Sequence, residues 1–173
     1  MNTHTHIVHR CYLGLGSNLN NPIKQLRTAI SHIQRLPQTY CLKSASWYQS
    51  KAWGVKEQND FINTVIEIKT TLTPLALLKA IKIIEYRLMQ RQSSLKWHAR
   101  KIDIDLLLYG QMRLRRNKLI IPHPWIHQRD FVYTPLLELK PLLPIELLKK
   151  LNTMSKSHNT DSKLKLITPG FAL

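Results

Sequence analysis

The sequence contains few cysteines, few acidic residues and no long apolar run. Its two cysteines, Cys11 and Cys41, are too few for a disulfide framework, and no Cys-x-x-Cys spacing suggests a metal or redox site. The N-terminal segment lacks the apolar centre of a signal peptide, and no stretch approaches the roughly 20 apolar residues of a membrane-spanning helix. These absences predict a soluble, cytoplasmic protein with reduced thiols.

Acidic residues are scarce in absolute and in relative terms. Ten Asp and Glu stand against 26 Lys and Arg, which gives a formal net charge of +16. Such an excess says little about the fold but favours anionic partners, namely nucleic acid, phosphorylated ligands or an anionic membrane. For most individual lysines, a solvated surface position is the simpler explanation.

What the sequence does have is 173 residues, 43% of them hydrophobic, which suits one domain with a substantial core. Periodicity predicts strands at 7–15, 40–50, 60–70 and 101–109 and helices at 23–36 and 71–91. This β-α-β-β-α-β order predicts an α+β, ferredoxin-like fold, with an antiparallel sheet and two helices on one of its faces. We expect one domain over 1–151 and a polar C-terminal extension over 152–173.

The sequence also gives expectations for one helix, one strand and two connecting segments. In the helix at 71–91, Thr73 is the predicted cap, Pro74 suits the first position, and the predicted apolar stripe is Leu77, Leu78, Ile81, Ile84 and Leu88. In the strand at 60–70, the better core face is Ile62, Thr64, Ile66 and Ile68, opposite Phe61, Asn63, Val65 and Glu67. The proline-bounded stretch 134–144 reads as irregular, and 152–163 reads as a mobile linker.

The stretch "ARKIDIDLLLYG", residues 99–110, places two carboxylates inside an apolar run. Residues i and i+2 of a strand share a face, so Asp103 and Asp105 project side by side, about 6.6 Å apart at their Cα atoms. Ile102, Ile104 and Leu106 then face the core. The alternation predicts a strand with one core face and one functional face.

Two carboxylates this close repel each other, and a divalent cation relieves the repulsion. Hard oxygen ligands suit Mg²⁺, which usually takes one or two carboxylates and completes its shell with water and phosphate oxygens. The alternative is that each Asp pairs with a cation, Arg100, Lys101 or Arg129, on an exposed sheet face. The spacing alone favours that alternative.

The surrounding charges favour the metal. From Arg87 to Arg129 there are ten Lys and Arg, and the only acids are Asp103 and Asp105. A carboxylate pair inside a basic cluster is typical of a polyphosphate site, where metal ions bridge phosphate oxygens and cations neutralise the remaining charge.

Four segments, in this order, resemble the 6-hydroxymethyl-7,8-dihydropterin pyrophosphokinase family, and the resemblance covers about residues 7–145. They are "LGLGSNLNNP", "DFINTVIEI", W-x-x-R-K-I-D-I-D-L-L-L-Y-G from Trp97, and "IPHPWIHQRDFVYTPLLEL". Members of this family transfer the terminal pyrophosphate of ATP to the hydroxymethyl group of the pterin, with AMP leaving, in folate biosynthesis. The resemblance therefore implies an ATP-dependent kinase on a ferredoxin-like core. We expect a monomer that acts on small molecules, without a membrane or nucleic-acid partner.

The resemblance also implies roles for individual residues. Asp103 and Asp105 would hold two Mg²⁺ ions. The other residues expected to take part in catalysis are Arg100, Trp97 and Arg129. The residues expected on the nucleotide side are Glu85, Leu106, Lys118 and His123. The residues expected to contact the pterin are Asn63, Phe61, Trp53 and Phe131, with Asn63 on the ring edge and Phe131 stacked on the ring. The alternatives are core packing for the two phenylalanines and a solvated helix charge for Glu85.

The sequence departs from the family pattern in the expected catalytic loop and beside it. Gln90 and Gln92 stand where arginines are usual, "SKAWGV" replaces a proline-rich stretch, and "HAR" replaces Gly-Pro-Arg. We expect the polar segment 90–99 to close over the bound substrates. The departures leave two alternatives open: a degenerate member with weak activity, and a basic ferredoxin-like module that binds nucleic acid. Against the second, the Lys/Arg-Gly-Phe strand pattern of RNA-recognition folds is missing.

Overall fold

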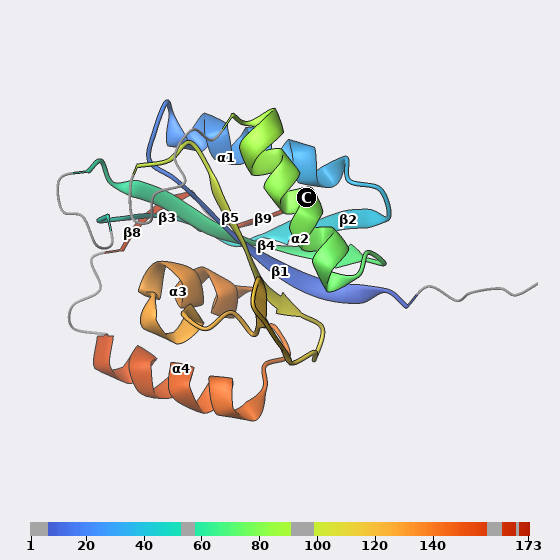
Figure 1. The fold of residues 1–173 in the computed structure, drawn as a ribbon. Helices are drawn as coiled ribbons and strands as arrows, with labels where there is room; N and C mark the ends of the chain where they lie inside the picture. The colour runs from blue at the N-terminus through green and yellow to red at the C-terminus, as the bar shows by residue number, and fades with distance from the viewer. Residues whose placement is uncertain (1–6, 53–57, 91–98, 159–163, 169) are drawn as a thin grey trace, which may run out of the picture.

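The computed structural model describes residues 7–52, 58–90, 99–158, 164–168 and 170–173 (Figure 1). The strands are β1 (His9–Ser17), β2 (Thr39–Ser44), β3 (Trp47–Ser50), β4 (Phe61–Thr70), β5 (Asp103–Tyr109), β6 (Leu114–Arg116), β7 (Leu119–Ile121), β8 (Lys165–Thr168) and β9 (Phe171–Ala172). The helices are α1 (Pro22–Gln34), α2 (Pro74–Ile83), α3 (Asp130–Glu138) and α4 (Ile145–His158), with a π-helical turn η1 (Ile84–Leu88) and a 3₁₀ turn η2 (Ile126–Gln128). The predicted α+β class is confirmed.

The main sheet is antiparallel, with the strand order β5-β1-β4-β2-β9. Strand β3 also pairs with β4, beyond the end of β2, so the predicted single strand at 40–50 is interrupted at Ala45 and Ser46. The interruption has a physical cause. Ala45 still donates its N–H to the carbonyl of Val65 (2.8 Å), but Ser46 donates its N–H to the Glu138 carboxylate of α3 (2.8 Å).

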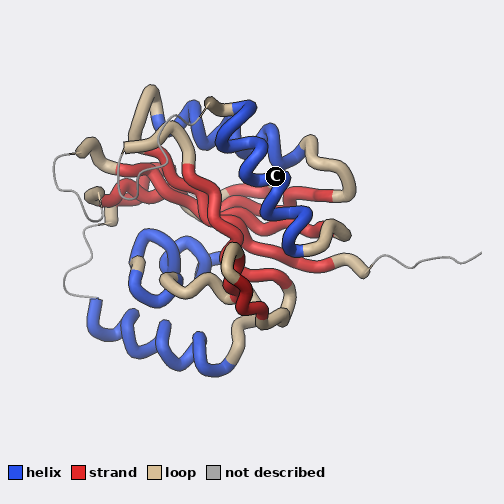
Figure 2. The backbone as a smooth tube through the Cα atoms, viewed as in Figure 1, coloured by secondary structure: helices blue, strands red, loops and turns tan. Residues whose placement is uncertain are grey.

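Helices cover both faces of the sheet (Figure 2): the two predicted helices lie on one face, as expected, and two further helices cover the other. Helices α1 and α2 pack on the face that carries Ile66 and Ile68, where the predicted core face of β4 is confirmed. On the other face, α3 and α4 bury Val65, Leu136 and Leu151. The strand alternation could predict the first core, but it gave no sign that the opposite face is partly covered as well.

Helix α3 overturns the prediction of an irregular segment from residue 134. The helix continues through Pro135 to Glu138, although a proline inside a helix removes one backbone hydrogen bond. Tyr133, Pro135 and Leu136 are all buried on the sheet side of the helix. Tertiary packing therefore outweighs the local preference.

The C-terminal extension is built into the sheet. Helix α4 runs to His158, so the predicted linker from residue 152 begins inside a helix, which is anchored by the buried side chains of Leu147 and Leu151. Strand β8 then pairs with β3, and β9 pairs with β2. Within the described part of the chain, no helix is both long and apolar enough to cross a membrane.

Helix α2 starts as predicted but ends differently. Thr73 caps it by accepting the N–H of Ala76 (3.3 Å), with Pro74 in the first position. The π-helical turn η1 follows and adds residues to the last turn, which rotates the later side chains around the axis. Leu88, predicted in the apolar stripe, is 53% exposed, whereas Glu85 and Met89 are buried.

Candidate active site

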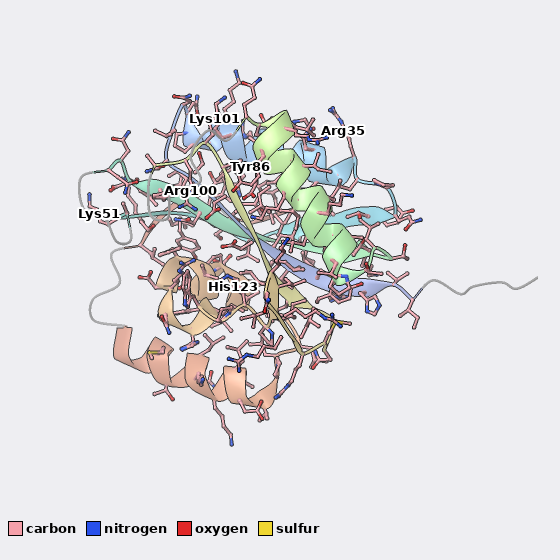
Figure 3. All side chains as sticks on the ribbon, in the orientation of Figure 1. Arg35, Lys51, Tyr86, Arg100, Lys101 and His123 are labelled. Carbon is pink, nitrogen blue, oxygen red and sulfur yellow. The ribbon has the colours of Figure 1, made fainter. Side chains whose placement is uncertain are left out.

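A cavity of about 310 Å³ opens on the face of the sheet that also carries α3. Its walls come from segments far apart in the sequence. Figure 3 labels four of the residues: Lys51 after β3, Tyr86 in η1, Arg100 before β5, and His123 after β7. The cavity brings together eight of the predicted site residues: Phe61, Asn63, Arg100, Asp103, Asp105, His123, Arg129 and Phe131.

The floor of the cavity is formed by two glycines of β1. Gly14 lies between Val65 of β4 and Asp105 of β5, and Gly16 lies between Asn63 and Asp103. A Cβ atom on Gly16 would come within 2.7 Å of the Asn63 Oδ1 atom. Without side chains on these residues, the Asn63 amide and the Leu107 side chain lie directly against the β1 backbone, and the cavity lies between the carboxylates and the amide. The alternating glycines of "LGLGSN" were the sequence signal for this floor, since glycine in a strand often marks a close approach.

Asp103 and Asp105 both face the cavity, as strand alternation predicted, and Ile102, Ile104 and Leu106 are buried in the core. The predicted cation pairing is also present, because an Arg100 nitrogen lies 2.7 Å from Asp103 and an Arg129 nitrogen lies 4.0 Å from Asp105. The two carboxylate side chains remain 27% and 34% exposed. They are therefore both paired and accessible from the cavity.

The carboxylate pair suits a hard divalent cation. Burial and the neighbouring Asp103 raise the pKa of Asp105, which means that its anionic form lacks stabilisation in the ligand-free protein. A search of the described residues gives no cluster of three or more His, Cys, Asp or Glu that could hold a metal ion. Two carboxylates beside open space fit Mg²⁺, which completes its shell with water and phosphate oxygens.

One wall of the cavity places a cation against two aromatic rings. The Arg129 guanidinium carbon lies 4.5 Å from the centre of the Trp125 ring and 6.0 Å from that of Phe131. Burial lowers the pKa of Arg129, and the carboxylate of Asp105 opposes that change. The rings and the carboxylate thus hold a positive charge at a half-buried position where an anionic ligand can meet it.

His123 is fixed beside this wall through its backbone. It donates its N–H to the carbonyl of Leu107 (2.9 Å), at the point where the pairing of β1 and β5 shifts register. Burial lowers the pKa of the imidazole, which favours the neutral form. Trp125 donates its N–H to the His123 Nδ1 atom at 3.4 Å, so a neutral imidazole presents its other nitrogen as a donor.

The opposite end of the cavity has the chemistry of a heterocycle site. Asn63 is buried, and its amide nitrogen donates to the Ser50 hydroxyl (2.9 Å), which fixes the plane of the amide. Phe61 lies two residues away on the same face of β4 and also lines the cavity, so the core-packing alternative does not account for it. An oriented amide beside an aromatic ring suits the edge and face of a flat polar ring.

Asn18 is a supporting residue to which the sequence motifs gave no role. Its Oδ1 atom accepts the N–H of Arg100 (2.8 Å), and its own N–H donates to the Arg100 carbonyl (3.2 Å). Its amide nitrogen donates to the carbonyl of Asn59 (3.1 Å). One buried amide therefore ties the segment before β5 to the segment before β4.

Three of the predicted nucleotide residues do not line the cavity. Leu106 is buried in the core, because strand alternation places its side chain opposite the aspartates. Lys118 is exposed at the turn between β6 and β7. Glu85 is buried behind β5, so the alternative of a solvated helix charge is wrong. Trp53 and Trp97 lie outside the described residues, as does most of the predicted closing segment 90–99.

The structure adds residues that the motifs did not indicate. Lys82 and Tyr86 reach the cavity from α2 and η1, and Ser50, Lys51 and Trp125 come from β3 and the segments that follow β3 and β7. With Lys82 and Lys51 the lining holds four Lys or Arg side chains against two carboxylates. The basic environment predicted around the aspartates is therefore present in space as well as in sequence.

Comparisons with known proteins agree with this geometry. Residues 12–141 match the 7,8-dihydro-6-hydroxymethylpterin-pyrophosphokinase (HPPK) family. Two relatives carry the name 2-amino-4-hydroxy-6-hydroxymethyldihydropteridine pyrophosphokinase. The protein from Haemophilus influenzae is 41% identical over 128 residues, which covers 74% of this chain and 79% of the relative. The protein from Aquifex aeolicus is 42% identical over 130 residues, which covers 75% of this chain and 79% of the relative.

A solved structure shows the same fold. The chain superposes on a crystal structure of HPPK-DHPS in complex with substrates with a TM-score of 0.63, at 12% identity. The match covers 96% of this chain but 47% of the other, so the chain spans about half the length of that protein.

Proposed function

The chain belongs to the 7,8-dihydro-6-hydroxymethylpterin-pyrophosphokinase family, and from this premise we propose how its cavity serves the reaction. The protein is an ATP-dependent pyrophosphokinase of folate biosynthesis. The pterin hydroxyl oxygen releases its proton to solvent and forms a bond to the β-phosphorus of ATP, while the bond from that phosphorus to the oxygen shared with the α-phosphate breaks and AMP leaves with that oxygen. Both substrates must therefore meet within one cavity.

The arrangement across Gly16 carries the proposal. The carboxylate of Asp103 and the amide of Asn63 flank the same glycine on opposite sides. We place the pterin ring at the Asn63 end, with its amide-like edge on the Asn63 side chain and its face on Phe61 and Phe131. The hydroxymethyl group then points along the glycine floor toward Asp103, where the triphosphate would lie.

The triphosphate end combines carboxylates with cations. Asp103 and Asp105 would hold two Mg²⁺ ions, which supply charge neutralisation to the triphosphate when bound. Arg129, between two aromatic rings, offers a charged donor to phosphate, and neutral His123 offers an uncharged one. Arg100 pairs with Asp103 in the ligand-free protein and would exchange that partner for phosphate once the carboxylate binds metal.

Several finer assignments stay predictions. Trp97 and Trp53 are expected at the closing loop and at the pterin, and we expect a monomer located in the cytoplasm. Gln90 and Gln92, in place of the usual arginines, predict weaker closure and a greater sensitivity to salt. Size-exclusion chromatography with light scattering tests the oligomeric state.

The deciding experiment measures AMP release from ATP in the presence of Mg²⁺ and 6-hydroxymethyl-7,8-dihydropterin, with mass spectrometry to identify the pterin diphosphate. Activity should require both substrates and disappear with EDTA. Calorimetric binding of both ligands without AMP formation would contradict turnover and identify a degenerate member instead. Replacing Gln90 and Gln92 by Arg should then restore activity if the missing charges are its cause.

A further inference from the structure

The buried ion pair behind strand β5 has no role in the mechanism above. It lies at the π-helical turn η1, which follows α2 and turns Glu85 into the protein, where its side chain is 0% exposed. Lys82, one turn earlier, places its Nζ atom 2.6 Å from the Glu85 carboxylate. π-Helical turns inside α-helices occur frequently at functional sites, which directs attention to what this one holds in place.

Both members of the pair bind the backbone of one residue. Glu85 Oε1 accepts the N–H of Ile104 at 2.6 Å, and Lys82 donates to the carbonyl of Ile104 at 3.3 Å. Strand β5 is at the edge of the main sheet, with β1 as its neighbour on one side. On the outer side of β5, the ion pair makes the hydrogen bonds to the Ile104 backbone that a further strand would otherwise make.

Ile104 is the residue between the two cavity aspartates. Its N–H belongs to the peptide group shared with Asp103, and its carbonyl belongs to the peptide group shared with Asp105. The ion pair therefore holds one peptide group beside each aspartate. Because a strand side chain leaves the backbone at a direction set by its peptide planes, fixing both planes fixes the relative direction of the two carboxylates.

Stability alone does not explain such an arrangement. A carboxylate removed from solvent is costly, and burial raises the pKa of Glu85 while Lys82 and the Ile104 N–H oppose that rise. Well-packed apolar residues often stabilise a buried position as well as an ion pair does. What apolar side chains cannot do is bind an N–H and a carbonyl on the exposed side of a strand.

The pair also reaches the cavity, because Lys82 lines it and its charge acts on both Asp105 and His123. We infer that Glu85 and Lys82 are positioning residues, which bind the two peptide groups around Ile104 and thereby set the spacing of the Asp103 and Asp105 carboxylates for a divalent cation. The inference rests on the proposed function of the aspartates. Loss of such supporting contacts in metal sites typically costs about 10- to 100-fold in affinity.

The first test needs neither substrate nor metal. In the ligand-free protein, Glu85→Ala should accelerate hydrogen exchange of the Ile104 amide by about tenfold or more relative to the Ile66 amide of the central strand β4, because its acceptor is gone. Glu85→Gln keeps an oxygen that can accept this N–H and should retain most of the protection. Lys79→Met, at an exposed position of the same helix, is the matched control and should change neither amide.

The second test measures Mn²⁺ affinity by electron paramagnetic resonance in the same variants, with ATP present. Affinity should fall by about 10- to 100-fold in Glu85→Ala, less in Glu85→Gln, and not in Lys79→Met. If Glu85→Ala does not fold, the comparison uses Lys82→Met against the double variant Lys82→Met/Glu85→Gln. The double variant should be the more stable, because it leaves no buried lone carboxylate.

Different results would contradict the positioning role and the proposed function. Ile104 exchange and Mn²⁺ affinity within twofold of wild type in Glu85→Ala would overturn the positioning role, whatever the wild-type enzyme catalyses. Equal acceleration of the Ile104 and Ile66 amides would also overturn it, because that result indicates a general loss of stability. Absence of AMP release by the wild-type protein, with the exchange result intact, would instead contradict the proposed function.

Discussion

One face of the sheet is closed at one end and hollow at the other. The closed half is formed by Tyr12, Val65, Tyr133, Leu136 and Leu151. The open half is formed by Gly14, Gly16, Asn63, Asp103 and Asp105. Strand β1 contributes to both: Tyr12 packs into the closed half, and the glycines two and four residues later place no side chain in the cavity. The site is thus made by omitting side chains from a regular strand, on a face that packing would otherwise close.

The largest effect on function is expected where the open half carries its charge. Asp103→Ala or Asp105→Ala should lower turnover on the order of 10²- to 10³-fold, because preorganised charge at the reacting phosphates is lost. Thermal stability should be retained, because both side chains lie outside the core and their mutual repulsion disappears. AMP release at limiting Mg²⁺ measures turnover, and scanning calorimetry measures thermal stability. Near wild-type turnover in either variant would refute the metal assignment.

A substitution in the closed half should lower stability and leave substrate binding nearly unchanged. Leu136 is 0% exposed between α3 and the sheet, and Leu136→Ala should lower the free energy of unfolding by about 2–5 kcal/mol. The KM values for ATP and pterin should stay near wild type while the protein is folded, because no cavity residue is removed. Urea unfolding measures the change in stability, and steady-state kinetics measure the KM values. A large change in pterin KM would mean that the halves are coupled.

Adding a side-chain atom to the glycine floor should make the open half more like the closed half. In Gly16→Ala, the new Cβ would meet the Asn63 Oδ1 atom at 2.7 Å and displace the amide from its position. Pterin affinity should fall by about tenfold, or about 1.4 kcal/mol, with binding of an ATP analogue nearly unchanged. Gly14→Ala is the matched control, since the three atoms nearest to its Cβ would all belong to the Leu107 side chain, at 3.3–3.5 Å. Equal calorimetric losses for both ligands in Gly16→Ala would indicate general damage.

The smallest effect is expected at the border between the halves, where Tyr48 donates to the Glu138 carboxylate at 2.5 Å. Tyr48→Phe should cost about 1 kcal/mol of unfolding free energy at neutral pH. Burial and Glu138 raise the pKa of Tyr48 from 10.0 to about 12, so the folded state holds this proton more tightly than the unfolded state. Wild-type stability should therefore fall as the pH rises from 10 toward 12, and Tyr48→Phe should reduce that slope. Identical slopes would rule out the linkage.

Elements with a strict two-residue period could be predicted from the sequence. In β5 the alternation located Ile104 in the core and Asp103 at the cavity, because a strand leaves no other choice. Gly14 and Gly16 were a sequence signal for the cavity floor, although the motifs did not assign it. The motif resemblance named Arg100, Asp103, Asp105 and Arg129, which line the cavity, but gave no sign of Lys51 and Lys82.

The remaining features depend on contacts between distant segments. The π-helical turn that buries Glu85 differs from an α-helical turn by one residue, and its hydrogen bond to Ile104 crosses 19 residues of sequence. Helix α3 passes through Pro135 because its apolar side finds the sheet. Neither contact leaves a mark on the local periodicity, so neither could be predicted from it.

The pairing of β8 and β9 extends the main sheet at β3 and β2. These strands lie beyond residues 12–141, and they bond to β3 and β2 along the side of the sheet opposite β5. A bare strand edge is a template for a second chain, and proteins avoid self-association by covering it or by placing charge on it. Here an added pair of short strands covers one edge, and the ion pair at Ile104 places charge on the other. The extension therefore pairs, within the chain, the edges of β2 and β3 that would otherwise be bare.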